Sequence, residues 1–251
     1  MKLRVLGSNG WYATGLANTV CILIETKDFY LVLDAGDGIH KLDQYVKDSK
    51  PIYIFLSHFH LDHIIGLHTL LKFKFRQGIT VYGQRGTKEI LQWFVNSPLT
   101  VPIGKLGYKL EVRDLPEGIS DNSEVPLPVE TGYLVHSDPC LGYRFEIDGK
   151  IVTYCTDTGY CENLVKLAKG ADLLITECTL GFKEQPTAEW PHLNPRWAAR
   201  AAKEAGTKKM MLMHFGPTAY QSPADREKAK ASAEEVFSPV VIANDGLEMK
   251  I

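Results

Sequence analysis

An apolar run that ends in a dense group of ligand-type side chains limits the choice of folds more than any other part of this sequence. The segment Ile54-Phe-Leu-Ser-His58-Phe-His60-Leu-Asp62-His63 places three histidines and one aspartate within six positions. Imidazole nitrogens and carboxylate oxygens at the end of a strand suit zinc or a similar divalent ion. Four such groups exceed the three protein ligands that one catalytic zinc usually takes, so the pattern predicts two ions. The alternative is a solvated loop with incidental histidines.

Three further candidates end apolar runs elsewhere in the chain. His136 ends Tyr133-Leu-Val-His136, Asp157 ends the run that starts at Ile151, and His214 ends Met210-Met-Leu-Met-His214. Taken alone, His136 would more often be a hydrogen-bonded structural residue. Because ligands of α/β sheets collect where strands stop, we expect these side chains to converge with the first group. His40 and His68 lack this setting, and we interpret both as structural.

The remaining pattern predicts an α/β chain. Helical segments separate short β-rich runs at Leu3–Leu6, Val20–Glu25, Tyr30–Asp34, Ile52–Ser57, Ile79–Tyr82, Lys109–Asp114, Gly142–Ile147, Ile151–Thr156, Leu173–Glu177, Met210–His214 and Val240–Ala243. Asn194-Pro195 and Gly206 delimit one helix, and Ser222-Pro223 opens another that reaches about Val236. Two halves with this order predict two mixed sheets with helices outside, in a single domain over residues 1–251. Pro116–Pro128 is expected to be a surface loop.

Composition excludes several classes of function. The 251 residues carry 28 Lys and Arg against 30 Asp and Glu, so no bulk positive field holds nucleic acid or an anionic membrane. The alternation Lys72-Phe-Lys-Phe-Arg76 is more typical of an amphipathic stretch than of a phosphate contact. No signal-peptide pattern and no long apolar run occurs, and the five cysteines form no Cys-x-x-Cys pair. We therefore expect a cytoplasmic protein with reduced thiols and no membrane contact.

The motif His58-x-His60-x-Asp62-His63 resembles the signature of the metallo-β-lactamase superfamily, and the likeness extends over essentially the whole chain. Asp34 matches the family's first motif, and His136, Asp157 and His214 match its third to fifth. The resemblance implies an αββα sandwich of two mixed β-sheets flanked by helices. It also implies that one metal takes His58, His60 and His136, that the other takes Asp62, His63 and His214, and that Asp157 bridges them.

Within that superfamily, the chain is most similar to the ribonuclease Z type of phosphodiesterase. The stretch after His136, the segment Leu174-Ile-Thr-Glu177 and His192 before an alanine-rich helix carry this likeness. His192 is the discriminating residue, because many other hydrolases of the superfamily have no such histidine. Relatives of this type are often dimers, so a homodimer is expected by analogy.

Two departures argue against tRNA processing. Ribonuclease Z carries a tRNA-binding arm between the third ligand and the bridging aspartate, yet only 21 positions separate His136 from Asp157. The loop Gly7–Thr19 also lacks the basic sequence of the processing enzymes. A small cyclic or short linear phosphodiester is therefore the expected substrate, with short RNA or a tRNA 3′ end as alternatives.

The expected chemistry is hydrolysis at two divalent ions, zinc most of all, with manganese or iron as alternatives. Two ions, the carboxylates of Asp62 and Asp157 and a bridging hydroxide leave a charge of about +1, which a phosphodiester monoanion matches. The hydroxide would attack in line while Asp62 orients it or accepts its proton. His192, oriented by Glu177, would protonate the leaving oxygen; the alternative for this pair is a hydrogen bond that fixes a loop.

Three other functions remain open at this point. A lactone or thioester hydrolase of the same superfamily would need only the metals. A diiron oxidoreductase is less consistent with the sequence, because those relatives have glutamate where this chain has His60. A metal-stabilised binding module without catalysis is the third. Trp11, Tyr12 and Phe59 can stack on a base, although packing in the core or at a rim is the favoured interpretation.

Overall fold

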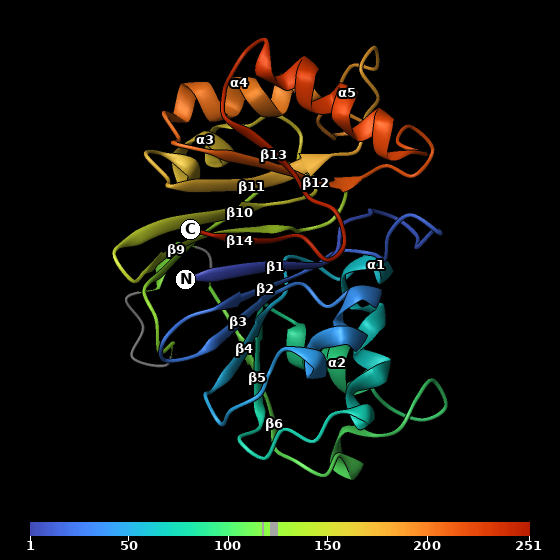
Figure 1. The fold of residues 1–251 in the computed structure, drawn as a ribbon. Helices are drawn as coiled ribbons and strands as arrows, with labels where there is room; N and C mark the ends of the chain where they lie inside the picture. The colour runs from blue at the N-terminus through green and yellow to red at the C-terminus, as the bar shows by residue number, and fades with distance from the viewer. Residues whose placement is uncertain (117, 121–124) are drawn as a thin grey trace.

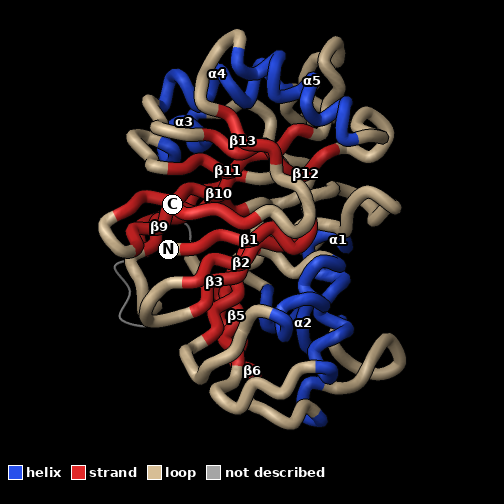
Figure 2. The backbone as a smooth tube through the Cα atoms, in the orientation of Figure 1, coloured by secondary structure: helices blue, strands red, loops and turns tan. Residues whose placement is uncertain are grey.

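The computed structural model describes residues 1–116, 118–120 and 125–251. In this part of the chain, the strands form two sheets that stack face to face, and helices cover the outer face of each sheet (Figures 1 and 2). The predicted αββα sandwich of two mixed sheets is confirmed. Among the described residues, no helix has both the length and the apolar character that spanning a bilayer requires.

The first sheet is built mainly from the N-terminal half. Its order is β14 (Glu248–Lys250), β1 (Lys2–Gly7), β2 (Cys21–Glu25), β3 (Tyr30–Leu33), β4 (Ile52–Phe55), β5 (Ile79–Gly83) and β6 (Leu110–Asp114). The pairs from β14 to β3 are antiparallel and those from β3 to β6 are parallel. The helical segments of this half are η1 (Asp37–Gln44), α1 (Leu61–Ile64), η2 (Ile65–Lys72), α2 (Thr87–Phe94) and η3 (Ile103–Lys105).

The second sheet repeats this change from antiparallel to parallel pairing. Its order is β13 (Val240–Ile242), β12 (Met210–Phe215), β11 (Leu173–Cys178), β10 (Lys150–Cys155), β9 (Leu141–Ile147), β8 (Val129–Tyr133) and β7 (Gly118–Ser120). The pairs from β7 to β10 are antiparallel and those from β10 to β13 are parallel. Helices α3 (Glu162–Ala168), α4 (Pro195–Ala205) and α5 (Pro223–Glu234) cover its outer face (Figure 1).

Strand β2 shows why the strands read as continuous apolar runs. Ile22 and Ile24 pack into the core between the two sheets, while Cys21 and Leu23 pack into the core under the helices of the first half. Successive side chains of a strand point to opposite faces, so a sheet covered on both sides needs apolar residues at every position.

The two helices with clear sequence signals begin where they are expected; α4 also ends as expected, and α5 ends at Glu234, two residues before the predicted end. The Asn194 side chain accepts hydrogen bonds from the first backbone N–H groups of α4, and Gly206 ends that helix in the left-handed conformation. Ser222 and Asp225 form a capping box at the start of α5. The start of α4 matters for the site because His192 lies three positions before it.

Some sequence expectations about secondary structure are wrong. β7, β8 and β14 were not expected as strands, and β8 ends at Tyr133, so His136 follows the strand through a short loop. In the predicted surface loop Pro116–Pro128, Gly118–Ser120 is a strand paired with β8, while 117 and 121–124 lie outside the described residues.

The two remaining histidines, His40 and His68, each contact a backbone carbonyl of their own helical segment and belong to neither donor group. His40 Nδ1 lies 2.6 Å from Asp37 O in η1, and His68 Nδ1 lies 2.6 Å from Ile65 O in η2.

The segment Lys72–Arg76 is amphipathic, as expected. Phe73 and Phe75 are buried in the core of the first half. The Lys72 ammonium group forms an ion pair with the Asp43 carboxylate, with 2.9 Å between Nζ and Oδ1.

Candidate metal centre

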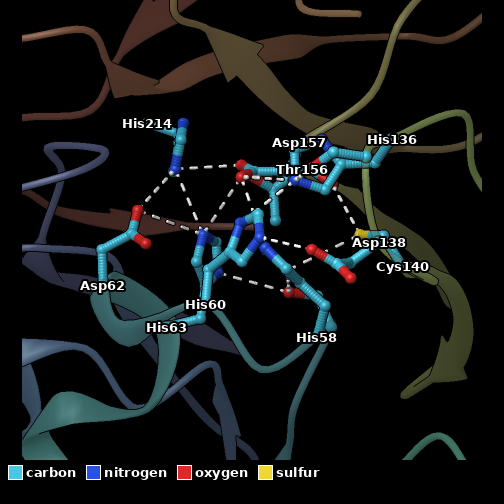
Figure 3. Close-up of polar contacts among 12 residues, drawn as sticks. His58, His60, Asp62, His63, His136, Asp138, Cys140, Thr156, Asp157 and His214 are labelled. Atoms are coloured by element: carbon cyan, nitrogen blue, oxygen red, sulfur yellow. Dashed lines mark hydrogen bonds and ion pairs between the residues drawn. The ribbon is translucent and has the colours of Figure 1, made fainter.

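All seven candidate ligands lie at one edge of the sandwich, where strands of both sheets end. His58, His60, Asp62 and His63 follow β4 and enter α1, His136 follows β8, Asp157 follows β10, and His214 lies in β12. Figure 3 shows their side chains pointing toward a common centre, with His214 on one side and the motif after β4 on the other. The convergence expected from the strand ends therefore occurs.

The first donor group consists of His58, His60, His136 and Asp157, with one ligand atom from each lying within 4.8 Å of the others. Asp157 Oδ2 lies 3.5 Å from His58 Nε2 and 3.7 Å from His136 Nε2. His60 Nδ1 lies 3.2 Å from His136 Nε2. Three imidazoles and one carboxylate in this arrangement are a donor set that zinc prefers.

The second donor group consists of Asp62, His63, Asp157 and His214, within the same 4.8 Å limit. Asp62 Oδ2 lies 3.1 Å from His214 Nε2 and 3.4 Å from His63 Nε2. Asp157 Oδ1 lies 2.9 Å from His214 Nε2. Asp157 therefore faces both groups, and its two oxygens are directed at different neighbours.

Asp157 and His214 are held in an unusual backbone conformation. Their φ angles are 52° and 49°, and Asp34 beside them has a φ of 56°. A positive φ is unfavourable for a residue with a side chain, and such strain concentrates at functional sites because the surrounding structure enforces it. Here it accompanies the orientation of the Asp157 and His214 side chains toward the centre, at the ends of β10 and β12.

Buried hydrogen bonds orient most of the imidazoles. His63 Nδ1 bonds the buried carboxylate of Asp34 at 2.7 Å, which also accepts from Ser57 Oγ and Tyr154 OH. His214 Nδ1 lies 3.0 Å from Thr179 Oγ1. Fixing one ring nitrogen in this way leaves the other, Nε2, with its lone pair toward the centre.

Two supporting contacts involve His58 and His60. His58 Nδ1 lies 3.0 Å from Ser57 Oγ, and His60 Nε2 lies 2.8 Å from Asp138 Oδ2. Sequence reasoning did not identify Ser57, Asp138 or Thr179, and it matched Asp34 to a motif without giving it a role. The sequence signal for these residues is their position: Ser57 directly precedes His58, Asp138 lies two positions after His136, and Thr179 lies two positions after Glu177.

The donor atoms fit a pair of cations. His58 Nε2 is fully buried without a hydrogen-bond partner, although it points into the centre. Burial lowers the pKa of His58 well below its usual value, so this ring is neutral and has a free lone pair. Burial also lowers the pKa of His214, but the carboxylate of Asp157 outweighs it and raises that pKa to about 10. The two buried carboxylates thus attract positive charge, which divalent cations would supply.

His192 and Glu177 form a pair beside the first donor group. His192 Nδ1 lies 2.8 Å from Glu177 Oε1, and the Glu177 carboxylate also accepts from the backbone N–H groups of Thr158 and Thr179. The His192 ring lies 5.3 Å from the His136 ring, centroid to centroid. Burial lowers the pKa of His192, but Glu177 outweighs this and raises it overall. A histidine fixed in this way can carry a proton to a group bound at the centre.

The centre opens into a cavity of about 470 Å³. His60, Asp62, His136, Asp157, His192 and His214 form its base. The walls come from Gly10, Trp11, Ser137, Thr179, Leu180, Glu184, Gln185, Thr187, Trp190, Pro191 and Gly216–Thr218. This volume lies within the range of small-molecule sites. Trp190, which sequence reasoning did not single out, is one of the lining residues.

Comparisons with known proteins agree with this geometry. Residues 30–215 match the family model described as the beta-lactamase superfamily domain. A ribonuclease Z of Synechocystis sp. is 27% identical and is matched over all of this chain and 94% of its own length. The probable metallo-hydrolase YhfI of Bacillus subtilis is 29% identical over 86% of this chain and 87% of its own length.

Solved structures show the same fold. The crystal structure of the metallo-beta-lactamase fold protein YhfI from Bacillus subtilis matches with a TM-score of 0.80 and 25% identity, over 99% of this chain and 98% of that one. The short form of human tRNase Z, ELAC1, matches with a TM-score of 0.76 and 22% identity, over 100% and 99% of the two chains. Fold, motif and family match therefore agree, and the chain belongs to the metallo-β-lactamase superfamily and is homologous to ribonuclease Z and to the YhfI metallo-hydrolase.

Proposed function

We propose that this protein is a phosphodiesterase that uses two divalent metal ions, zinc first among them, to hydrolyse a small phosphodiester. The observation that carries this proposal is the contact between His192 and Glu177 beside the first donor group. A lactone or thioester hydrolase would need the metal ligands alone, whereas a phosphodiester has an alkoxide leaving group that benefits from a proton donor.

The proposed ligands are those of the two donor groups: His58, His60 and His136 for one ion, Asp62, His63 and His214 for the other, and Asp157 for both. When bound, the cations would supply Lewis acidity and lower the pKa of water toward about 7. Asp62 would orient the nucleophile or accept its proton. His192, held by Glu177, would donate a proton to the leaving oxygen.

The short segment between His136 and Asp157 and the net charge of the chain favour a small substrate over tRNA. Every residue between His136 and Asp157 is used by the loop to β9, by β9 and β10, and by their turns, so this segment contains no arm. The alignment with the Synechocystis ribonuclease Z extends over 311 positions, more than the 251 residues of this chain, so that relative contains insertions. With a net charge of −2, little holds a folded tRNA, and processing of its 3′ end is the second candidate.

One experiment tests the proposal directly. Protein reconstituted with zinc or manganese is assayed on bis-p-nitrophenyl phosphate, a dinucleotide with an alkoxide leaving group, a lactone, a thioester and a precursor tRNA. We expect turnover of both phosphodiesters, and loss of metal and activity together in Asp157→Ala. His192→Ala should keep both metals and lose turnover of the dinucleotide, because an alkoxide needs a proton to leave whereas p-nitrophenolate does not. Preferred turnover of the lactone or thioester, with full activity in His192→Ala, would refute it. Homodimerisation and a cytoplasmic location remain predictions from the resemblance and the sequence.

A further inference from the structure

The walls of the cavity carry almost no charge. Of the described residues that line it, none is lysine or arginine, and Glu184 is the one acidic side chain outside the donor groups. The Glu184 carboxylate accepts a hydrogen bond from the backbone N–H of Gly181. A second or third phosphate of a substrate would therefore find no cationic partner in these walls. The site suits one negative charge at the metal centre and uncharged groups around it.

Trp11 presents an exposed aromatic face at one side of the cavity. The residue is 70% exposed, and its backbone N–H donates to Asp62 Oδ2 at 2.7 Å. Its φ of 60° is unfavourable for a bulky residue. The surrounding loop enforces this conformation, because Asn9 Nδ2 donates to the carbonyl oxygen of Tyr12 and Arg226 Nη2 holds Asn9 Oδ1 at 2.6 Å. Trp11 is thus fixed to the second donor group, and its ring contacts the Tyr12 ring, 5.1 Å away between centroids, while remaining largely exposed.

Trp190 presents a similar face at the first donor group. Its side chain is 57% exposed, and its ring lies 4.9 Å from the ring of His192, centroid to centroid. Its backbone carbonyl accepts from the N–H of His192, and its N–H donates to Thr187 Oγ1. Trp190 is thus held against His192, the residue that would protonate the leaving oxygen, by a backbone hydrogen bond and a ring contact.

We propose that Trp11 and Trp190 are stacking surfaces that select phosphodiesters with a planar aromatic group on each side of a single phosphate, such as a dinucleotide. This inference rests on the proposed function. The contact with His192 assigns Trp190 to the leaving group, and the contact with Asp62 assigns Trp11 to the group that stays on the phosphate. Stacking selects planar groups without adding charge, which agrees with the uncharged walls.

Two substrates with the same leaving group separate these roles. Thymidine 5′-(p-nitrophenyl) phosphate has an aromatic base on the retained side, and methyl p-nitrophenyl phosphate has none. We expect Trp11→Ala to lower the kcat/KM ratio of the thymidine to the methyl substrate about tenfold, and Trp11→Phe to keep most of that ratio. Trp190→Ala is expected to lower kcat/KM for both substrates about equally and to leave the ratio unchanged.

Trp93 provides the matched control, because it is 68% exposed on α2 and does not line the cavity. Trp93→Ala is expected to match the wild type on both substrates. An unchanged ratio in Trp11→Ala, or an equal loss on both substrates, would overturn the role of Trp11. Full activity of Trp190→Ala on both would overturn the role of Trp190.

A binding measurement keeps this inference separate from the proposed function. If the metal-loaded wild type hydrolyses neither diester, the proposed function fails, and calorimetric titration with thymidine 5′-monophosphate still tests Trp11. We then expect about tenfold weaker binding in Trp11→Ala than in Trp93→Ala. Equal affinities of these two variants would refute the stacking role.

Discussion

Gly10 lies directly against the imidazole of His214: a Cβ atom added at Gly10 would come within 2.3 Å of the ring Cε1 atom. Gly10→Ala must therefore displace either the ring or the loop. We expect metal affinity of the second donor group and catalytic activity to fall about tenfold or more. Metal content by elemental analysis and hydrolysis of bis-p-nitrophenyl phosphate check this.

Gly15 in the same loop is the control for that substitution. A Cβ atom there meets no atom within 4 Å, so Gly15→Ala is expected to keep its metals and its activity. Wild-type metal content in Gly10→Ala would contradict the close packing at His214.

The second prediction concerns the carboxylate that supports His63. Asp34 accepts from His63 Nδ1, Ser57 and Tyr154 in a fully buried setting. Asp34→Asn keeps the shape of the side chain, and asparagine also adopts a positive φ. Its NH2 group, however, would face one of the hydrogen-bond donors that the carboxylate now accepts from. We expect about tenfold weaker metal binding in a competition titration with a chelator.

Tyr154→Phe is the control, because it removes a hydrogen bond to Asp34 without changing the contact between Asp34 and the His63 imidazole. It removes one hydrogen bond to Asp34, so unfolding in urea should show a loss of about 1 kcal/mol, with metal affinity preserved. Equal metal affinities of Asp34→Asn and the wild type would mean that Asp34 does not orient His63.

The third prediction is a shift in the pH dependence of turnover. Glu177 raises the pKa of His192 against the opposing effect of burial, so the wild type keeps its proton donor above the usual histidine pKa. Activity is lost as the pH rises through that value. Glu177→Gln leaves burial unopposed and lowers the pKa of His192, so the alkaline limb of the kcat profile should move to lower pH.

Glu184→Gln is the matched control for that profile. Glu184 also lines the cavity, but its carboxylate bonds the backbone N–H of Gly181 and not His192. The alkaline limb of the kcat profile of Glu184→Gln should coincide with that of the wild type. If the alkaline limb of Glu177→Gln also coincided with that of the wild type, His192 would not be the proton donor.

The fourth prediction concerns removal of the metals. A ligand present at 1,000 times its dissociation constant stabilises a fold by about 4 kcal/mol, which corresponds to a Tm shift of about 10 °C at this size. We expect EDTA to lower the Tm of the zinc-loaded protein by about that amount in calorimetry. Asp157→Ala, which lacks the shared carboxylate, should show no response to either zinc or EDTA.

The parts of the structure that sequence could predict are those encoded by nearby residues. The ends of α4 follow from Asn194, Pro195 and Gly206, which act within a few positions of one another. The strand before His58 follows from its apolar run, and the grouping of distant ligands follows from the rule that sites form where strands stop.

The parts that sequence could not predict depend on distant partners. β7 and β14 have three residues each, and their pairing with β8 and β1 decides their structure more than their own propensity. Asp138 contacts a histidine 78 positions away, and no local pattern encodes that distance. Trp190 was missed because its position in the cavity wall depends on the path of the loop before α4.

Each donor group combines side chains from both sheets, since His58 and His63 follow β4 while Asp157 and His214 belong to the other half. A cation bound in either group would therefore tie the N-terminal and C-terminal halves together at this edge. Neither half alone can assemble a complete coordination sphere. Full zinc affinity would then require both halves to be docked, so metal binding and docking of the halves would stabilise each other.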